Sequence, residues 1–140
     1  MNAKLDAIIA KVFETTPIIQ GLPEAFKSSK SRFIFSNFQL NIGHPRAGAS
    51  VHYHHPTTSA LLYGLKHWFM YPPNDAFYNT ESIHQWYHGS YKRLKEKDIR
   101  PLECMQQSGD VIFIPDAWAH GILYLRESIS VSHLYTPPRA

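Results

Sequence analysis

Three histidines have the residue type and spacing to hold a single metal ion. His52 and His54 flank Tyr53 in an H-Y-H sequence, and on a strand the side chains of residues i and i+2 point to the same face. His120 is the candidate third ligand, because it follows the segment 115–119 at the start of another expected strand. Three protein ligands leave coordination positions open, as in catalytic sites, whereas structural zinc sites are closed by four ligands. The spacing therefore indicates a catalytic type of metal site.

A second interpretation of these histidines stays open on spacing alone. The chain has nine histidines in 140 residues, so some H-x-H sequences arise by chance. His52 and His54 could line a polar barrel mouth without binding a metal. The chain has one cysteine, Cys104, which excludes an internal disulfide and a zinc site built on paired cysteines.

Length and composition fit one domain with one hydrophobic core. Apolar residues make up 44% of the chain, and the net charge is +3. The only basic run, residues 92–100, is interrupted by acids, so we expect no nucleic-acid partner. The first residues contain no unbroken apolar stretch of the length of a signal peptide or membrane helix, so we expect no membrane association. Taken as written, the chain is cytoplasmic by default.

The pattern of apolar residues predicts a mainly β domain with little helix. Residues 4–14 carry apolar side chains at helical spacing and predict an amphipathic helix. Residues 81–96 could hold another helix, in a surface insertion. Short apolar segments with Gly or Pro turns between them predict strands at 33–35, 38–42, 49–54, 103–106, 111–114, 121–125 and 128–134, with two more within 61–71 around Gly64. We expect a sandwich or barrel over residues 32–140, preceded by a helix and linker at 1–31.

Several separated motifs resemble the JmjC-domain family of cupin-like oxygenases. The segment His52–Trp68 is similar to the family's central motif, H-x-D followed by G-x-K-x-W. Ser108–Pro115 and Trp118–His120 resemble its second half, in which P-G-D-x-x-x-x-P precedes W-x-H. The likeness extends over about residues 33–135. The H-x-H sequence, the short spacing to G-L-K-H-W, and R-P-L-E-C before P-D-x-W-x-H resemble the JmjC domain-containing protein 8 subgroup.

The resemblance implies a fold, a cofactor set and roles for particular residues. The family fold is a double-stranded β-helix, or jelly roll, and its members hold Fe(II) with two histidines and one carboxylate. They use 2-oxoglutarate to hydroxylate or demethylate protein side chains. By position, His52 is the first metal ligand, His120 is the last, and His54 stands in place of the carboxylate. Lys66 and Ser132 are the candidate 2-oxoglutarate-binding residues, although Lys66 could also be an exposed lysine on a turn.

Three departures from the family pattern leave two functions open. His54 removes a negative charge from the ligand set, Ala49 replaces a threonine of many relatives, and Tyr124 replaces an asparagine of several. The chain is therefore either an oxygenase of the protein hydroxylase type or a catalytically inactive binding or scaffold protein. In both cases we expect a protein substrate or partner, and a homo-oligomer is possible. The chain is short for the family, so helix 4–14 or a partner subunit would cover an exposed strand edge.

Overall fold

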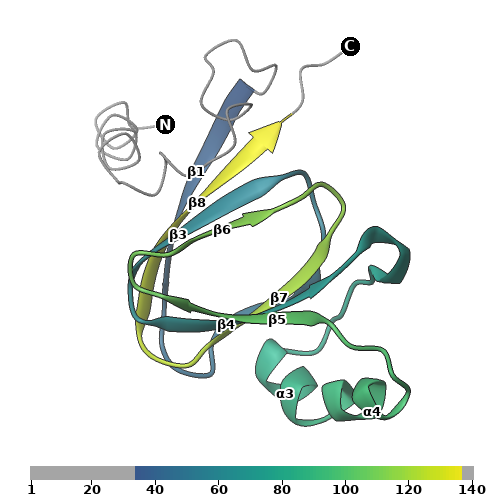
Figure 1. Ribbon diagram of the computed structural model, residues 1–140. Helices are drawn as coiled ribbons and strands as arrows, with labels where there is room; N and C mark the ends of the chain where they lie inside the picture. Colours follow the sequence, from purple (N-terminus) through teal and green to yellow (C-terminus); the bar gives the residue numbers. More distant parts are fainter. Residues whose placement is uncertain (1–33, 137–140) are drawn as a thin grey trace.

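The computed structural model describes residues 34–136, which form eight strands, two short α-helices and one 3-10 turn. The expected helix at 4–14 and the linker that follows it lie outside the described residues. The elements in chain order are β1 (Ile34–Gly43), β2 (Gly48–His52), β3 (Thr57–Tyr63), β4 (Leu65–Tyr71), η2 (Pro73–Asp75), α3 (Ile83–His88), α4 (Ser90–Glu96), β5 (Leu102–Gln107), β6 (Val111–Ile114), β7 (Ala119–Tyr124) and β8 (Ser128–Thr136). Figure 1 shows the strands wrapped around a common interior, with α3 and α4 together outside β4, β5 and β7.

The strands form two antiparallel four-stranded sheets. Sheet I has the order β1-β8-β3-β6, and sheet II has the order β2-β7-β4-β5. Strands that follow one another in the chain mostly belong to opposite sheets, so the chain passes from one sheet to the other repeatedly. This order is that of a double-stranded β-helix, which confirms the expected fold class. None of the helices within residues 34–136 is both long and apolar enough to cross a membrane.

Most strands lie where the sequence predicts them, with two informative differences. Strand β2 ends at His52, so the expectation that the strand continues to His54 is wrong. Residues 81–96 hold two helices rather than one, because the helical conformation is interrupted at Gly89. Helix α3 begins after Ser82, whose hydroxyl accepts a hydrogen bond from the Gln85 amide, as an N-cap residue does.

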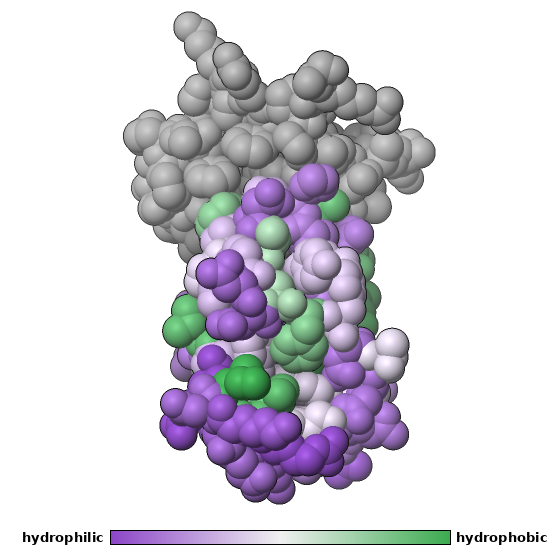
Figure 2. Space-filling model, turned by 90° about the vertical axis from the view of Figure 1, so that its right-hand side faces the viewer, coloured by the Kyte–Doolittle hydropathy of each residue, from purple (hydrophilic) through white to green (hydrophobic). Residues whose placement is uncertain are grey.

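The hydrophobic core lies between sheet II and the helices, outside the barrel. The cluster of buried apolar side chains comprises Val51, Phe69, Tyr71, Ile83, Trp86, Tyr91, Ala119 and Leu123. Phe69 on β4 is fully buried, and its ring meets Trp86 of α3 and Tyr91 of α4 edge to face, at centroid distances of 5.3 Å in both cases. In Figure 2 the lower end of the molecule, where the two helices lie, is predominantly hydrophilic on its exposed side. The helices therefore give sheet II a covered apolar face.

The interior between the two sheets is unusually polar. Lys66, Gln106 and Ser130 are buried there, and the Lys66 ammonium donates a hydrogen bond to the Ser130 hydroxyl on the opposite sheet. The Trp68 indole donates to the Gln106 side chain at 2.9 Å, and the amide of Gln106 donates to the Ser59 carbonyl at 2.8 Å. A buried polar surface of this kind is costly unless its groups are paired with hydrogen-bond partners.

Candidate metal centre

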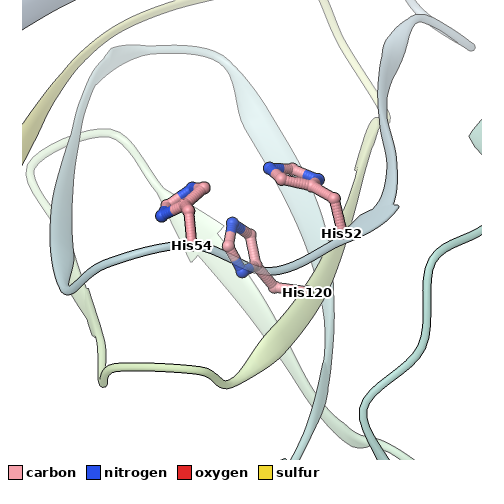
Figure 3. A group of neighbouring side chains, drawn as sticks. All are labelled: His52, His54 and His120. Carbon is pink, nitrogen blue, oxygen red and sulfur yellow. The ribbon is translucent and has the colours of Figure 1, made fainter.

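His52, His54 and His120 converge at one end of the barrel interior. One nitrogen from each of the three imidazoles lies within 4.8 Å of the other two. The ring centroids are 4.4 Å apart for His52 and His120, 4.8 Å for His54 and His120, and 5.2 Å for His52 and His54. Figure 3 shows the three rings turned toward a common point from two separate chain segments. The structure thus brings together the three residues that the sequence singled out.

Two different backbone features position these side chains. His52 and His120 are direct cross-strand partners in the β2–β7 ladder, so their side chains leave the sheet on the same face. His54 lies beyond β2, in the loop to β3, and the amide of Ala117 donates to its carbonyl at 3.2 Å. Ala117 has a φ of 59°, a left-handed conformation that a non-glycine residue adopts at some cost. The turn before β7 therefore holds the loop that carries the third imidazole.

The hydrogen bonds of the three rings select one tautomer. The Nδ1 atom lies 2.7 Å from the Ser50 carbonyl in His52, 2.7 Å from the His55 carbonyl in His54, and 3.1 Å from the Trp118 carbonyl in His120. A carbonyl oxygen only accepts, so each Nδ1 must carry the hydrogen. Each Nε2 then keeps its lone pair, which is the form in which histidine binds a metal.

Burial favours the neutral form of the imidazoles of His54 and His120. Removal from water lowers the pKa of His120 to about 3, with smaller opposing and supporting effects from the Trp118 carbonyl and the other two rings. Burial also lowers the pKa of His54. At neutral pH both rings are therefore without the proton that would compete with a metal ion.

The donor set fits a divalent transition metal. Three neutral imidazole nitrogens suit Fe(II), Zn(II), Ni(II) and Cu(II), and they leave positions for water or a ligand. The three nitrogens lie close enough to one another to share one ion. With no carboxylate among these three ligands, the site lacks the negative charge of a two-histidine, one-carboxylate triad.

Lys66 supplies a buried positive charge on the same inner face. The residue is 1% exposed, its ammonium donates to the Ser130 hydroxyl, and its Nζ lies 4.5 Å from the centre of the Tyr124 ring. Burial lowers the pKa of Lys66 to about 8. Among the described residues, no carboxylate pairs with it. A buried cation that contacts a hydroxyl and a ring face fits an anionic ligand, whose charge would offset the cost of burial.

Ser132, the other candidate co-substrate-binding residue, makes its hydrogen bonds to residues other than Lys66. Ser132 accepts a hydrogen bond from Asn41 at 3.1 Å and bonds to Ser59 at 3.3 Å. Ser130, which the sequence reasoning missed, is the serine that contacts Lys66. The signal for it was the alternation Ser128-Ile129-Ser130-Val131-Ser132, which places the hydroxyls on one face of β8.

Tyr124 fills the space where a smaller side chain would leave the interior open. Its ring packs so closely on Gly43 that a side chain at that position would collide with it. The same ring lies beside the Lys66 ammonium. Ala49, the other departure, pairs with Ile122 in the regular part of the β2–β7 ladder.

Comparisons with known proteins support the same family. No family model matches the sequence. The chain is 34% identical over 97 residues to the human (Homo sapiens) JmjC domain-containing protein 8, an alignment that covers 68% of this chain and 36% of that protein. It is 35% identical over 86 residues to the 2-oxoglutarate and iron-dependent oxygenase JMJD4 of Danio rerio, covering 54% of this chain and 20% of that protein. The chain thus spans only about a third or less of the length of these curated relatives.

A solved structure shares the fold. YcfD, a ribosomal oxygenase from Escherichia coli in complex with cobalt and succinic acid, superposes with a TM-score of 0.59 at 14% identity, over 94% of this chain and 28% of that one. Its identity is too low to carry more than the fold. The sequence relatives, the double-stranded β-helix and the order of the motifs agree with one another, and the chain belongs to the JmjC-domain (cupin-like) family.

Proposed function

We propose that the chain is the metal-binding core of a non-haem Fe(II)- and 2-oxoglutarate-dependent oxygenase that acts on a protein side chain. The observation that carries this proposal is the convergence of three imidazoles whose Nδ1 atoms are all occupied by backbone carbonyls. A relative whose name states that it is a 2-oxoglutarate and iron-dependent oxygenase, and a fold neighbour in complex with cobalt and succinic acid, support the choice of cofactors.

In this proposal each inner-face residue has a distinct task. His52, His54 and His120 hold the metal ion, which together with 2-oxoglutarate supplies the oxidising chemistry when bound. Lys66 binds the distal carboxylate of the co-substrate, and the hydroxyls of Ser130 and Ser132 orient that carboxylate and the lysine. Lys66 pairs with Tyr124 and Met70 pairs with His120 in the β4–β7 ladder, so one row of side chains separates the lysine from the metal ligands. A ligand with a carboxylate at each end could thus reach both.

A second function is favoured by one specific feature of the interior. The Tyr124 ring lies against both Gly43 and Lys66, where it narrows the space beside the ammonium. Combined with a ligand set that lacks a carboxylate, this feature favours a binding or scaffold protein that retains the barrel without turnover. Such a protein would engage its partner through its surface and would not use the metal for catalysis.

One assay separates these two functions. Protein purified anaerobically with Fe(II) is expected to form succinate from 2-oxoglutarate, even without a protein substrate. His52→Ala should abolish this activity, whereas His55→Ala, a change at an exposed neighbour, should leave it intact. Bound iron with no succinate formed would favour the scaffold protein, and a protein that binds neither Fe(II) nor Co(II) would contradict the proposal. His54→Asp restores the negative charge of a two-histidine, one-carboxylate triad, and increased turnover in this variant would measure what the histidine costs.

A further inference from the structure

A notch on the outer face of sheet II lies directly behind two of the candidate metal ligands. Gly121 follows His120 on β7, and a Cβ atom there would lie 2.8 Å from Cδ1 of Ile83 and 3.0 Å from Cγ2 of Val51. A Cβ atom on Gly48 would lie 2.9 Å from Cγ2 of Ile83. The two distances to Ile83 are shorter than real Cβ contacts, so a side chain at either position would collide with Ile83. At Gly48 the carbonyl oxygen of Ile122 would lie closer still, so the backbone of β7 also requires a glycine there. Ile83, the first residue of α3, is 2% exposed.

The notch adjoins an irregular part of the β2–β7 ladder. The ladder pairs Ala49 with Ile122 and then His52 with His120, so three steps on β2 oppose two on β7. This arrangement is a β-bulge, in which regular hydrogen bonds between the strands are interrupted. Ladder hydrogen bonds therefore do not by themselves fix the spacing between β2 and β7 just before the His52–His120 pair.

The segment that leads into α3 holds this bulge from outside. The Asn79 amide donates to the Val51 carbonyl at 2.8 Å, and the Ser50 hydroxyl donates to the Glu81 carbonyl at 2.6 Å. The carbonyl of Ser50 in turn accepts from Nδ1 of His52 at 2.7 Å. The group that orients the His52 ring thus belongs to a residue that segment 79–83 holds in place.

We propose that Ile83 is a positioning residue for the metal centre, and that it sets the spacing of His52 and His120 by filling the notch formed by Gly48, Val51 and Gly121. This inference rests on the proposed metal site and adds a contribution from outside the barrel. Ile83 belongs to the apolar cluster on the outer face of sheet II, whereas His52 and His120 point into the barrel. It acts through the β2–β7 backbone, because Val51 and Gly121 each adjoin a metal-binding histidine in the chain.

The test measures Co(II) affinity and the visible absorption spectrum of the Co(II)-bound protein. Ile83→Ala is expected to weaken Co(II) binding about tenfold and to alter the spectrum, as changes that disturb the orientation of a ligand do. Leu94→Ala, a truncation in α4 of a partly buried side chain on the same core, is the matched control. It should lower stability without changing Co(II) affinity or the spectrum. Equal affinity in Ile83→Ala and the wild type, or an equal loss in Leu94→Ala, would overturn the proposal.

A size exchange across the notch gives an independent test. Gly121→Ala places a methyl group against Cδ1 of Ile83 and should weaken Co(II) binding. Ile83→Val removes that Cδ1 atom, so the double variant Ile83→Val/Gly121→Ala should recover affinity relative to Gly121→Ala alone. Additive losses in the double variant would contradict a packing relation between these two residues.

Imidazole NMR of the metal-free protein distinguishes failure of this inference from failure of the metal site. Ile83→Ala should shift the ring signals of His52 and His120, and Leu94→Ala should leave them unchanged. If the wild type binds no Co(II) but these shifts occur, the positioning role stands and the proposed function falls. If the signals do not move in Ile83→Ala, Ile83 does not position the rings.

Discussion

The two faces of sheet II have different roles, although the same strands form both. Along β4, Phe69 and Tyr71 point outward into the apolar cluster with α3 and α4, whereas Lys66 and Trp68 point inward among hydroxyls, amides and imidazoles. Both faces are buried, so exposure does not distinguish them. The chemistry of their side chains distinguishes them. The outer face packs against apolar side chains of the helices, whereas the inner face carries a cation and the imidazoles of His52 and His120, next to which the loop brings the imidazole of His54. Stability and binding are thus assigned to opposite sides of one sheet.

The largest expected effect is on the outer face. Phe69→Ala removes a fully buried ring that contacts Trp86 and Tyr91, and such truncations cost about 3–5 kcal/mol of the free energy of unfolding. Urea denaturation measures the loss. Leu62→Ala, a truncation of a half-exposed side chain on β3, should change stability by less than about 0.5 kcal/mol. A cost below about 1 kcal/mol for Phe69→Ala would mean that the interface with the helices is not the main core.

The next effect belongs to the inner face and concerns binding. His120→Ala removes one of three metal donors, so Co(II) affinity should fall by at least about 100-fold, more than for loss of a residue that only orients a ligand. Isothermal titration calorimetry at pH 7 measures this change. His133→Ala, a substitution at a buried histidine of β8 that is not part of the triad, serves as the control and should retain affinity. Unchanged binding in His120→Ala would place the metal elsewhere.

A variant of the inner face is expected to gain stability. Lys66→Met replaces a buried ammonium by an apolar side chain of similar length, so the metal-free protein should become about 2 kcal/mol more stable at pH 7 while 2-oxoglutarate binding is lost. Lys92→Met, an exposed change on α4, should alter neither property. Thermal unfolding and titration with 2-oxoglutarate measure the two outcomes.

The pH dependence of stability gives a separate check on Lys66. Its pKa is lowered to about 8 in the folded protein from an unfolded value of 10.5. Between these two values the unfolded chain binds a proton that the folded chain does not, so this residue makes stability rise as pH increases from about 8 to about 10.5. This increase in stability with pH should disappear in Lys66→Met. A wild type whose stability shows no such difference from Lys66→Met would indicate that the ammonium is well solvated.

The same comparison explains how far the sequence could predict the structure. Strand positions follow from alternating side chains and from Gly and Pro turns, which are local signals. The cross-strand pairing of His52 with His120 is a long-range contact that no local pattern predicts. The carbonyls that orient the rings belong to Ser50, His55 and Trp118, and any residue type supplies a carbonyl, so no sequence signal marks them. His54 reaches the site from a loop rather than a strand, and its placement depends on contacts with a distant turn.

The outer core was also hard to predict, for a different reason. The sequence places apolar residues in β4 and in the segment of α3 and α4, but periodicity does not say which face of a sheet a helix covers. The glycines at 48 and 121 lie in strands, and the reason for their small size is visible only in three dimensions: Ile83 lies against Gly121, and both Ile83 and the Ile122 carbonyl lie against Gly48. The sequence places residues 81–96 in a surface insertion, whereas the structure buries Ile83, Trp86 and Tyr91 of this segment against sheet II.

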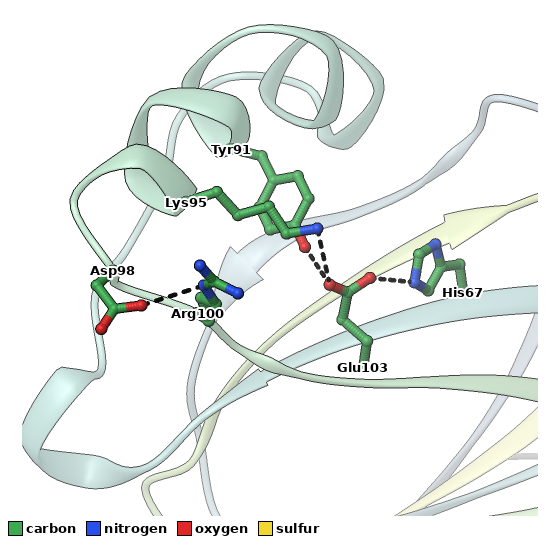
Figure 4. Close-up of polar contacts among 6 residues, drawn as sticks. All are labelled: His67, Tyr91, Lys95, Asp98, Arg100 and Glu103. Atoms are coloured by element: carbon green, nitrogen blue, oxygen red, sulfur yellow. Dashed lines mark hydrogen bonds and ion pairs between the residues drawn. The ribbon is translucent and has the colours of Figure 1, made fainter.

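The smallest expected effect tests whether the two faces are separate at β4 and β5. Glu103 on β5 accepts hydrogen bonds from Tyr91 of α4 and from Nε2 of His67 at 2.8 Å, with Lys95 3.7 Å away (Figure 4). Glu103→Gln keeps the shape but removes the charge, so we expect a loss of about 1 kcal/mol in the free energy of unfolding, a value that allows for the partial exposure of the carboxylate.

Co(II) affinity should be unchanged in Glu103→Gln, because this cluster contacts β4 and β5, whereas the notch filled by Ile83 lies on β2 and β7, behind the histidines. Glu96→Gln, a substitution on the exposed surface of α4, is the matched control and should affect neither stability nor affinity. If Glu103→Gln weakens Co(II) binding as much as Ile83→Ala does, any loosening of the helices disturbs the metal site. Ile83 would then have no specific positioning role, and the metal site would depend on the packing of the helices as a whole.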